Sequence, residues 1–279
     1  MNTSGYTWYL FDADGTLLDY PAAEEQALRK TAAAYALPMN SEIRSSYHSI
    51  NSVMWNRLEQ GTISSAELRW KRFEQLSVRY GWQIDPRRFS SDYLEQLSEG
   101  GFMIDGAEKM LERLLGSGFA DGGGKTAGEA AGVTAGEAAG EAPKAGAAAK
   151  KGVTARAAAG EAPKAGAVKA AVITNGLRDV QFRRLEKAGI LHFFEEIIIS
   201  EDAPAPKPHS AYFDYALERI GFSRKEEILV IGDSLSSDIA GGAACGLDTC
   251  WFNAEGRALT GPWKPSFEIK NWEDFFTAV

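Results

Sequence analysis

Residues 8–20, WYLFDADGTLLDY, decide the fold of this chain. An apolar run from Trp8 to Phe11 ends at two carboxylates that stand one residue apart, Asp12 and Asp14, and a glycine and a threonine follow them. An apolar run without polar alternation is typical of a strand that is buried on both faces, as in a parallel sheet. The two acids are therefore predicted to stand at the carboxyl end of a buried strand.

The same pattern returns four times later in the chain. Further buried strands are predicted over residues 169–174, 195–200, 228–231 and 249–252. Helical spacing of apolar residues separates them, over 105–115, 179–188, 211–220 and 238–245. Short apolar strands that alternate with helices indicate a parallel sheet with helices on both faces. The predicted fold class is therefore α/β with a Rossmann-like sheet.

Residues 19–100 are different, because their pattern is helical throughout. We expect four helices, over 21–36, 41–60, 64–80 and 86–98, with glycines between them. Such a module cannot belong to the sheet, so it should lie over one end of it. The predicted division is a core segment over 1–18, a helical cap domain over 19–100, and the rest of the Rossmann-like core over 101–279.

A low-complexity insertion over residues 116–169 interrupts this core. The sequence AAGEAPKAGA occurs letter for letter at 138–147 and again at 158–167. Repeats of Ala, Gly, Pro, Lys and Glu bury too little apolar area to offset chain entropy, so we expect a disordered surface loop. A tether that binds a partner is the alternative. Long loops cost little extra to close, so the fold should tolerate either.

The composition limits the class of protein. The 279 residues allow one large or two smaller domains, and the net charge of −8 argues against a general nucleic-acid binder. The N-terminus lacks a signal-peptide pattern, and no run approaches the roughly 20 apolar residues that span a bilayer. We expect a cytoplasmic protein without membrane contact, a monomer or homodimer, with Cys245 and Cys250 as small core residues.

The candidates for chemistry stand at the carboxyl ends of the predicted strands, where open α/β sheets bind their ligands. They are Asp12, Asp14 and Thr16 after the first strand, Thr174, Asn175 and Gly176 after the second, Lys207 after the third, and Asp233, Ser234 and Asp238 after the fourth. Acids, one lysine and hydroxyl side chains are therefore predicted to converge on one edge of the sheet.

These strand-end motifs resemble, in order, the four motifs of the haloacid dehalogenase superfamily. They are FDADGT at 11–16, ITNG at 173–176, Lys207 within PKP, and GDSLSSD at 232–238. Each motif alone is weak, but the ordered set covers essentially the whole chain outside the repeat segment. The helical insertion matches the superfamily's helical cap. The resemblance implies a Mg²⁺-dependent phosphomonoester hydrolase, because an acid two places after the nucleophile points to phosphotransfer rather than dehalogenation.

The resemblance also implies a role for each motif residue. Asp12 would be the nucleophile that forms an aspartyl-phosphate, and Asp14 the general acid and then the general base. The phosphoryl oxygens would be held by Thr174 and by the Asn175 and Gly176 amides, with Lys207 neutralising the phosphate. Around the metal, Ser234 and Asp238 would orient the ligands or the lysine rather than ligate directly.

Elementary electrostatics supports these roles. A carboxylate that attacks a phosphate dianion meets repulsion on the order of 4 kcal/mol per pair of unit charges at about 4 Å and an effective dielectric near 20. A divalent cation and a lysine offset that repulsion, and Mg²⁺ prefers oxygen ligands. Asp12, the backbone carbonyl of Asp14, and Asp233 are the predicted metal ligands. Residues two apart on a strand share a face, so Asp12 and Asp14 can address one ligand.

The cap carries a narrower resemblance. NSVMWNRLEQGTISSAELRWKRFEQL at 51–76, together with the text of 212–253, is similar to the house-cleaning pyrimidine 5′-nucleotidases of the superfamily. That similarity implies a small phosphomonoester substrate, a pyrimidine nucleoside monophosphate. The Ala/Gly repeat is a departure from that group. A sugar-phosphate phosphatase or phosphomutase is the alternative, and a scaffold that works through the repeat is the alternative from another class.

A nucleobase needs an aromatic or apolar surface and a few polar groups. The predicted substrate contacts in the cap are Asn51, Trp55 and Arg69, with Tyr47, Trp70 and Phe73 as further aromatic candidates. Asn51 and Trp55 stand four apart and share a helix face. The alternative is that the aromatics only pack the core of the cap. His48, His192 and His209 show no spacing of a base or a metal ligand.

Overall fold

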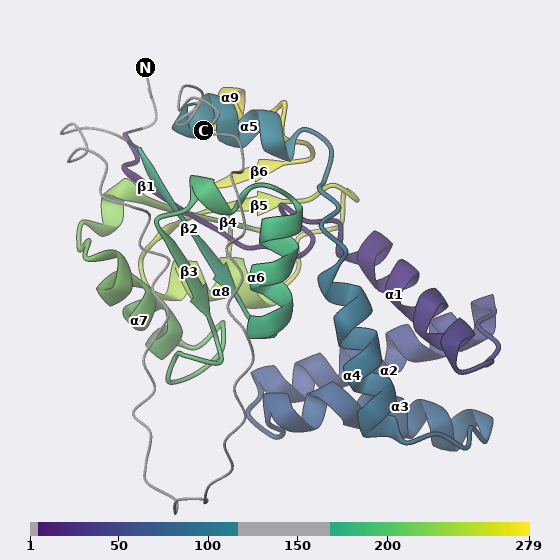
Figure 1. The fold of residues 1–279 in the computed structure, drawn as a ribbon. Helices are drawn as coiled ribbons and strands as arrows, with labels where there is room; N and C mark the ends of the chain where they lie inside the picture. The colour runs from purple at the N-terminus through teal and green to yellow at the C-terminus, as the bar shows by residue number, and fades with distance from the viewer. Residues whose placement is uncertain (1–4, 117–167) are drawn as a thin grey trace, which may run out of the picture.

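The computed structural model describes residues 5–116 and 168–279, and its centre is one parallel sheet (Figure 1). The strand order is β3-β2-β1-β4-β5-β6. The strands are β1 Trp8–Phe11, β2 Lys169–Thr174, β3 Glu196–Ile199, β4 Ile228–Gly232, β5 Asp248–Phe252 and β6 Phe267–Ile269. The Rossmann-like α/β class predicted from the sequence is confirmed.

Strand β1 lies in the middle of the sheet and is buried along its whole length. Phe11 pairs in register with Val172 on one side and with Ile231 on the other. The strand order therefore reverses direction around β1, and a crevice opens at the carboxyl ends of strands where such a reversal occurs. This topology places the end of β1 at the natural ligand site of the sheet.

Helices cover both faces of the sheet (Figure 1). They are α5 Ala107–Leu115, α6 Arg178–Lys187, α7 Ser210–Ile220, α8 Ala240–Ala244 and α9 Phe275–Ala278, with short 3₁₀ turns at Leu191–Phe193 and Lys225–Glu227 and a π-helical turn at Leu235–Ile239. Tyr9 and Phe11 pack toward α5 and α9, whereas Trp8 and Leu10 pack toward α7. The alternation of side chains along β1 thus supplies two cores from one strand.

The cap consists of four helices beyond the carboxyl edge of the sheet (Figure 1). They are α1 Tyr20–Ala34, α2 Ser41–Glu59, α3 Ser65–Tyr80 and α4 Pro86–Ser98, and each lies within two residues of the helix expected from the sequence. Helix α3 begins at a capping box in which the Ser64 and Glu67 side chains bond to each other's backbone N–H. A separate aromatic core, including Tyr47, Phe73 and Phe89, holds the four helices together.

The structure differs from the sequence prediction near the C-terminal end. The helix expected over 238–245 begins earlier, with the π-helical turn at Leu235–Ile239, because Ser234 accepts a hydrogen bond from the Ser237 N–H. Strand β6 and helix α9 were not predicted, since elements of three and four residues are too short to show a period. The repeat segment lies outside the described residues, except for its ends at 116, 168 and 169.

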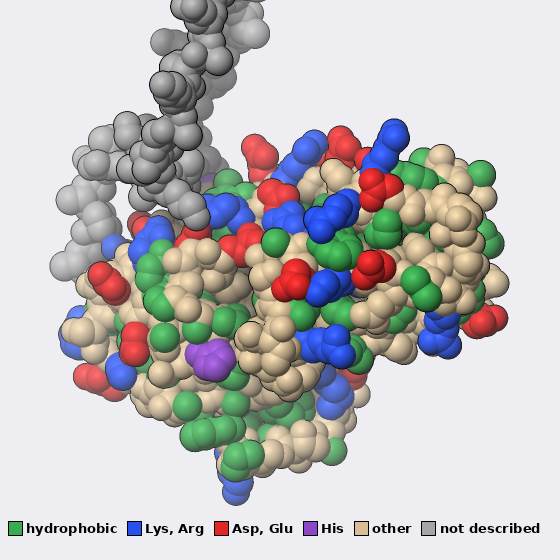
Figure 2. Space-filling view, turned by 90° about the horizontal axis from the view of Figure 1, so that it is seen from below, with side chains coloured by type: hydrophobic (Ala, Val, Ile, Leu, Met, Phe, Trp, Pro, Cys, Tyr) green, Lys and Arg blue, Asp and Glu red, His purple; other side chains and the backbone are tan. Residues whose placement is uncertain are grey.

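The surface of the described part is mixed in charge. On the face in Figure 2, acidic and basic side chains are interspersed, and hydrophobic side chains are scattered among them. No continuous basic stripe, of the kind that follows a nucleic-acid backbone, is visible on this face. Among the described helices, none combines the length and the hydropathy that a membrane span requires.

Candidate active site

A buried lysine organises the site. The Lys207 Nζ lies 2.7 Å from Asp12 Oδ1 and 2.6 Å from Asp238 Oδ1, and it donates to the Ile173 carbonyl oxygen at 2.9 Å. Each of the three N–H groups of the Lys207 ammonium therefore has a hydrogen-bond acceptor. Lys207 and Asp238 are each only 1% exposed. Ionic groups so far from water stay charged only because they compensate one another.

Burial and neighbouring charges set the protonation of this cluster. Burial raises the pKa of Asp12 well above its ordinary value; the Lys207 ammonium opposes that rise, and Asp238 and Asp233 add to it. Burial lowers the pKa of Lys207, but the two carboxylates outweigh burial and raise it on balance. The Lys207 side chain therefore stays positively charged, and this single cation lies beside several carboxyl groups.

Three acids at this point form a group that fits a metal ion. Asp12, Asp233 and Asp238 each offer a carboxylate oxygen, and these oxygens lie within 4.8 Å of one another. Burial, followed by the charge of Asp238, raises the pKa of Asp233 to about 7. This excess of buried negative charge and the oxygen donor set suit Mg²⁺. The residues present thus fit the group that the sequence predicted.

The turn after β1 lets Asp233 approach. Gly15 has φ +81°, and a Cβ at this position would lie 2.8 Å from the Asp233 Oδ2. A residue with a side chain would therefore be strained by the positive φ and would also push the carboxylate away. The glycine of the DADGT sequence is explained by this close approach.

The loop after β2 is tied to the lysine. Asn175 Nδ2 donates to the Lys207 carbonyl oxygen at 3.0 Å, and the Lys207 N–H donates to Asn175 Oδ1 at 2.9 Å. Thr174 is 2% exposed and accepts the Gly176 N–H at 2.9 Å. The Asn175 side chain thus joins two strand ends, and the Gly176 amide is occupied by Thr174 in this arrangement.

One cavity of about 180 Å³ brings the predicted core residues together. Its lining comprises Asp12, Asp14, Thr174, Asn175, Gly176, Lys207, Asp233, Ser234, Ser237 and Asp238 from the core, and Tyr20, Trp55 and Glu59 from the cap. Every strand-end candidate of the sequence analysis lines this cavity except Thr16, which is fully buried and lies 3.4 Å from the Asp12 carboxylate through its hydroxyl oxygen.

Asp14 is held by two residues that sequence reasoning missed. Its Oδ2 accepts from Gln181 Nε2 at 2.5 Å, and its Oδ1 forms an ion pair with Arg184. Arg184 is fully buried, and its Nε donates to the Gly100 carbonyl oxygen, where the cap returns to the core. A sequence signal existed: Gln181 and Arg184 are polar residues on the otherwise apolar buried stripe of α6.

The cap reaches the cavity with the last turn of α2. Trp55, which the sequence predicted, lines the cavity, and so does Glu59, which it did not. Burial raises the pKa of Glu59, although the Lys207 ammonium opposes the rise. The Glu59 carbonyl oxygen lies 3.1 Å from the His209 ring nitrogen, so this turn contacts the core directly. Glu59 follows Trp55 by four residues, the spacing of a shared helix face.

The structure does not bring Asn51 to this cavity. Asn51 is 6% exposed, and its side chain bridges two charged groups inside the cap. Its Oδ1 accepts from Arg72 Nη1 at 2.9 Å, and its Nδ2 donates to Glu24 Oε1 at 3.1 Å. In this structure the Asn51 side chain therefore contacts Arg72 and Glu24, and its contact with a substrate stays a prediction.

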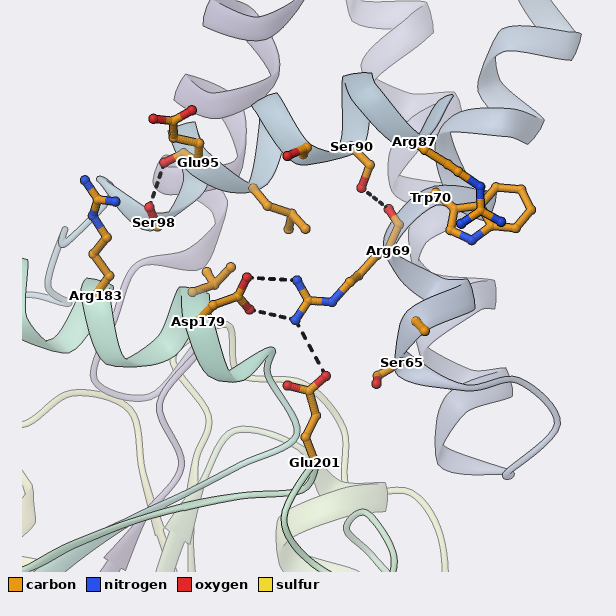
Figure 3. A pocket seen from close by; sticks show the side chains of 14 residues that line it. Ser65, Arg69, Trp70, Arg87, Ser90, Glu95, Ser98, Asp179, Arg183 and Glu201 are labelled. Atoms are coloured by element: carbon orange, nitrogen blue, oxygen red, sulfur yellow. Dashed lines mark hydrogen bonds and ion pairs between the residues drawn. The ribbon is translucent and has the colours of Figure 1, made fainter. Parts of the chain in front are cut away.

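Arg69 is likewise elsewhere, in a second cavity of about 640 Å³ between cap and core (Figure 3). Its guanidinium forms a two-pronged pair with Asp179 at 2.6 and 2.9 Å and lies 3.6 Å from Glu201 (Figure 3). Asp179 and Glu201 neutralise the charge of the Arg69 guanidinium and hold it in this cavity, away from Asp12. Trp70 lies in the same cavity under the Arg87 guanidinium, at 4.1 Å. Of the other aromatic candidates, Tyr47 and Phe73 are fully buried in the core of the cap.

The chain that folds in this way, with four acids and a buried lysine at the carboxyl edge of a parallel sheet, matches over residues 6–246 a family model described as haloacid dehalogenase-like hydrolase. The chain belongs to this family of hydrolases.

Among curated relatives, the HAD-hydrolase YfnB of Bacillus subtilis is 30% identical over 271 residues, which cover 97% of this chain and 94% of YfnB. The pyrimidine 5′-nucleotidase YjjG of Escherichia coli is 26% identical, with 90% of this chain and 88% of YjjG covered. The pyrimidine 5′-nucleotidase PynA of Streptococcus pneumoniae is also 26% identical, with 98% and 95% covered.

Solved structures agree with this relationship. The crystal structure of YfnB bound to magnesium superposes with a TM-score of 0.75 at 29% identity, covering 98% of this chain and 97% of that one. The L-2-haloacid dehalogenase of Xanthobacter autotrophicus shares the fold, with a TM-score of 0.66 at 15% identity and coverage of 98% and 97%.

Proposed function

We propose that this hydrolase is a Mg²⁺-dependent phosphatase that acts on pyrimidine nucleoside 5′-monophosphates through an aspartyl-phosphate on Asp12. The observation that carries the proposal is the buried pairing of Lys207 with Asp12 beside the three-acid cluster. This pairing holds a carboxylate oxygen at a strand end and supplies the positive charge that an incoming phosphate requires. The pyrimidine 5′-nucleotidases among the relatives support the substrate.

In the first step, a carboxylate oxygen of Asp12 attacks phosphorus, and the bond from phosphorus to the leaving oxygen breaks. Asp14 donates a proton to that oxygen, so the nucleoside leaves as an alcohol. In the second step, Asp14 takes a proton from water, which attacks phosphorus and releases Asp12 and inorganic phosphate. Lys207 neutralises charge on both the carboxylate and the phosphoryl group throughout.

The metal would be held by Asp12 and Asp233, with the backbone carbonyl of Asp14 and with Asp238 beside them. When bound, Mg²⁺ supplies charge neutralisation between the nucleophile and the phosphate dianion. The site's own residues prepare for that role, since the cluster carries more buried negative charge than Lys207 balances. The magnesium in the YfnB crystal structure supports the choice of ion.

Asp14 must reorient before it can act as the acid, because both of its oxygens face donors from α6 in this structure. A shift of the cap would change that clamp, since Arg184 also bonds to the Gly100 carbonyl oxygen at the cap's return to the core. The YfnB crystal structure is reported to reveal interdomain movement, which supports a mobile cap here.

The proposal includes the division of the chain into a core domain over 1–18 and 101–279 and a cap domain over 19–100.

The cavity also bears on the substrate. Its volume of about 180 Å³ is below the roughly 300–1,000 Å³ of typical ligand pockets, so a whole nucleotide needs the cap to open further. Trp55 and Tyr20 offer aromatic surface in the lining of the cavity.

The proposal also places the enzyme in the cytoplasm, as a monomer or homodimer that acts on a small-molecule phosphomonoester.

Two experiments test the proposal. Asp12→Asn keeps the size of the side chain and removes its nucleophilic charge, so turnover should vanish while circular dichroism stays that of the wild type. Near-normal activity in this variant would refute the assignment of the nucleophile. A panel of nucleotides and sugar phosphates, with Mg²⁺ and with EDTA, tests the rest: a clear preference for a hexose or glycol phosphate removes the nucleotidase proposal, and full activity in EDTA removes the metal.

A further inference from the structure

A third, small cavity, of about 20 Å³, adjoins the cavity at Asp12 and Lys207 on the cap side of Asp14. Asp14, Tyr20, Trp55 and Gly176 line both cavities, so the two are parts of one cleft. The rest of its lining comprises Arg72 and Leu97 from the cap and Leu177, Val180, Gln181 and Arg184 from α6 and its approach. Two arginines from different domains therefore meet beside the proposed general acid.

Three polar atoms of this lining have no hydrogen-bond partner in the described part of the chain. They are Arg72 Nη2, Arg184 Nη2 and Gln181 Oε1. Their residues are 1%, 0% and 1% exposed, respectively. More than about 90% of buried polar groups in proteins are paired, so unpaired groups at one cavity indicate a partner that comes from outside the chain.

Arg72 is held rigidly for such a partner. Its Nη1 donates to Asn51 Oδ1 at 2.9 Å, and its guanidinium lies 5.1 Å from the ring centres of Phe73 and Tyr93. An arginine on the apolar stripe of α3, at four residues from Leu68 and from Leu76, does not serve packing alone. One edge of the guanidinium is fixed within the cap, and the other is free to face the cavity.

The charges around the cavity are already balanced. Arg184 forms an ion pair with Asp14, and Arg72 is joined to Glu24 through the Asn51 side chain. A second phosphate dianion would add uncompensated negative charge next to Asp14, and it would also face the Gln181 carbonyl oxygen. A neutral ring that carries both a carbonyl oxygen and an N–H group suits this site without that cost, because its oxygen can accept from the arginines and its N–H can donate to the Gln181 oxygen.

We propose that Arg72 Nη2, with Arg184 Nη2 and Gln181 Oε1, forms a leaving-group subsite that binds a neutral carbonyl-bearing ring rather than a second phosphate. This inference rests on the proposed phosphatase function and deepens it. The phosphate lies at Asp12 and Lys207, and the leaving group passes Asp14 toward the cap. Trp55 and Tyr20 form the aromatic wall, and Arg72 determines which leaving groups are bound. The cap must open for the ring to enter a space that now fits about one water molecule.

Arg72→Lys tests the subsite, because lysine keeps the charge but loses the fork of donors. Values of kcat and KM are measured for UMP, for phenyl phosphate, whose ring carries no acceptor, and for a sugar bisphosphate. Arg79→Lys, an exposed change on the same helix, is the matched control. We expect kcat/KM for UMP to fall about 10–100-fold, mainly through KM, as for a lost hydrogen bond to a charged group. Phenyl phosphate should change by less than about 3-fold, within the scatter of surface substitutions.

Each other result is decisive. Equal losses for both substrates, or no loss for either, overturn the subsite and leave a cavity that holds only a water molecule. A loss confined to a sugar bisphosphate shows that the group binds a second phosphate and overturns the neutral-ligand assignment. If Arg72→Lys fails to fold, Asn51→Ala, which frees the Arg72 guanidinium from its support, should give the same selectivity at smaller size. Wild-type protein that hydrolyses no phosphomonoester refutes the proposed function itself.

Discussion

Replacing Lys207 by methionine probes the charge cluster on which the proposed chemistry depends. Methionine keeps an unbranched apolar side chain of similar shape, with a thioether sulfur in place of one methylene, and removes the ammonium group. In the wild-type structure that group lies 2.7 Å from Asp12 Oδ1 and 2.6 Å from Asp238 Oδ1, and its side chain is 2% exposed. The variant therefore leaves two carboxylates close together in a buried place without their cation.

The expected loss of stability follows from burial rather than from distance. Removing one partner of a buried ion pair costs about 3–5 kcal/mol, a large part of the roughly 5–15 kcal/mol by which domains are stable. The chain contains a matched control in Lys71, whose Nζ lies 2.6 Å from Glu67 Oε1 with side chains 32% and 41% exposed. An exposed pair four residues apart on a helix contributes far less, because water and salt screen both charges.

The assay is urea unfolding in EDTA, followed by circular dichroism. Lys207→Met should lose about 3–5 kcal/mol of stability, and Lys71→Met only a small fraction of that loss. Adding Asp238→Asn to Lys207→Met should restore part of the loss, because one of the two uncompensated charges is then gone. Lower pH should also restore stability to Lys207→Met, since a protonated carboxyl needs no cation.

Equal losses of stability in the two lysine variants would refute the reasoning. Ion pairs with similar N–O distances would then contribute the same free energy whether they are buried or exposed. Failure of Asp238→Asn to recover any stability would refute it as well. In that case the cost of Lys207→Met would come from packing of the side chain stem and not from the carboxylates.

Three further experiments, a substitution, a labelling reaction and a pH dependence, test other parts of the structure. Gly176→Ala places a Cβ 2.0 Å from Gln181 Nε2, so it should shift the loop after β2, to which the proposal assigns phosphate binding, and lower kcat, while the fold loses about 1–3 kcal/mol as in other overpacked sites; kinetics and urea unfolding measure the two effects. Burial raises the pKa of Cys250 to about 12, so a thiol reagent at pH 8 should label it only at the rate of unfolding, and fast labelling would contradict its burial. In EDTA, Asp233 binds a proton in the folded state up to a pKa of about 7 and in the unfolded state only to about 4, so its contribution to stability should fall as pH rises from 4 to 7, and Mg²⁺ should offset the fall above pH 7; the same pH dependence in Asp233→Asn as in the wild type would contradict the raised pKa.

Much of the fold was accessible from sequence, because its elements report on local environment. A strand buried on both faces must be apolar at every position, as WYLF is, and a helix at the surface repeats its apolar residues every three or four positions. These rules locate all but the shortest elements. Strand β6, with three residues, carries no period from which it could have been recognised.

The residues at the carboxyl edge of the sheet could be predicted from the sequence for a similar reason. Parallel strands align their carboxyl ends at one edge, so residues at those ends converge whatever their distance along the chain. Asp12, Lys207 and Asp233, which the sequence separates widely, line one cavity as expected. The cap did not follow so simple a rule, because a residue on a helix can face its own bundle or the cleft, and periodicity does not distinguish the two.

The sequence by itself determined the class of fold, the order of the elements and the residues at the carboxyl edge of the sheet, since each depends on local pattern and on a fixed property of parallel sheets. Tertiary structure alone decided which polar side chains of α3 and α6 lie at the candidate site. Arg69 and Arg72 stand three residues apart, yet one pairs with Asp179 between the domains and the other lies buried beside the cleft. The physical reason is that the partner of a charged side chain is set by the packing of distant elements, and no local period encodes that packing.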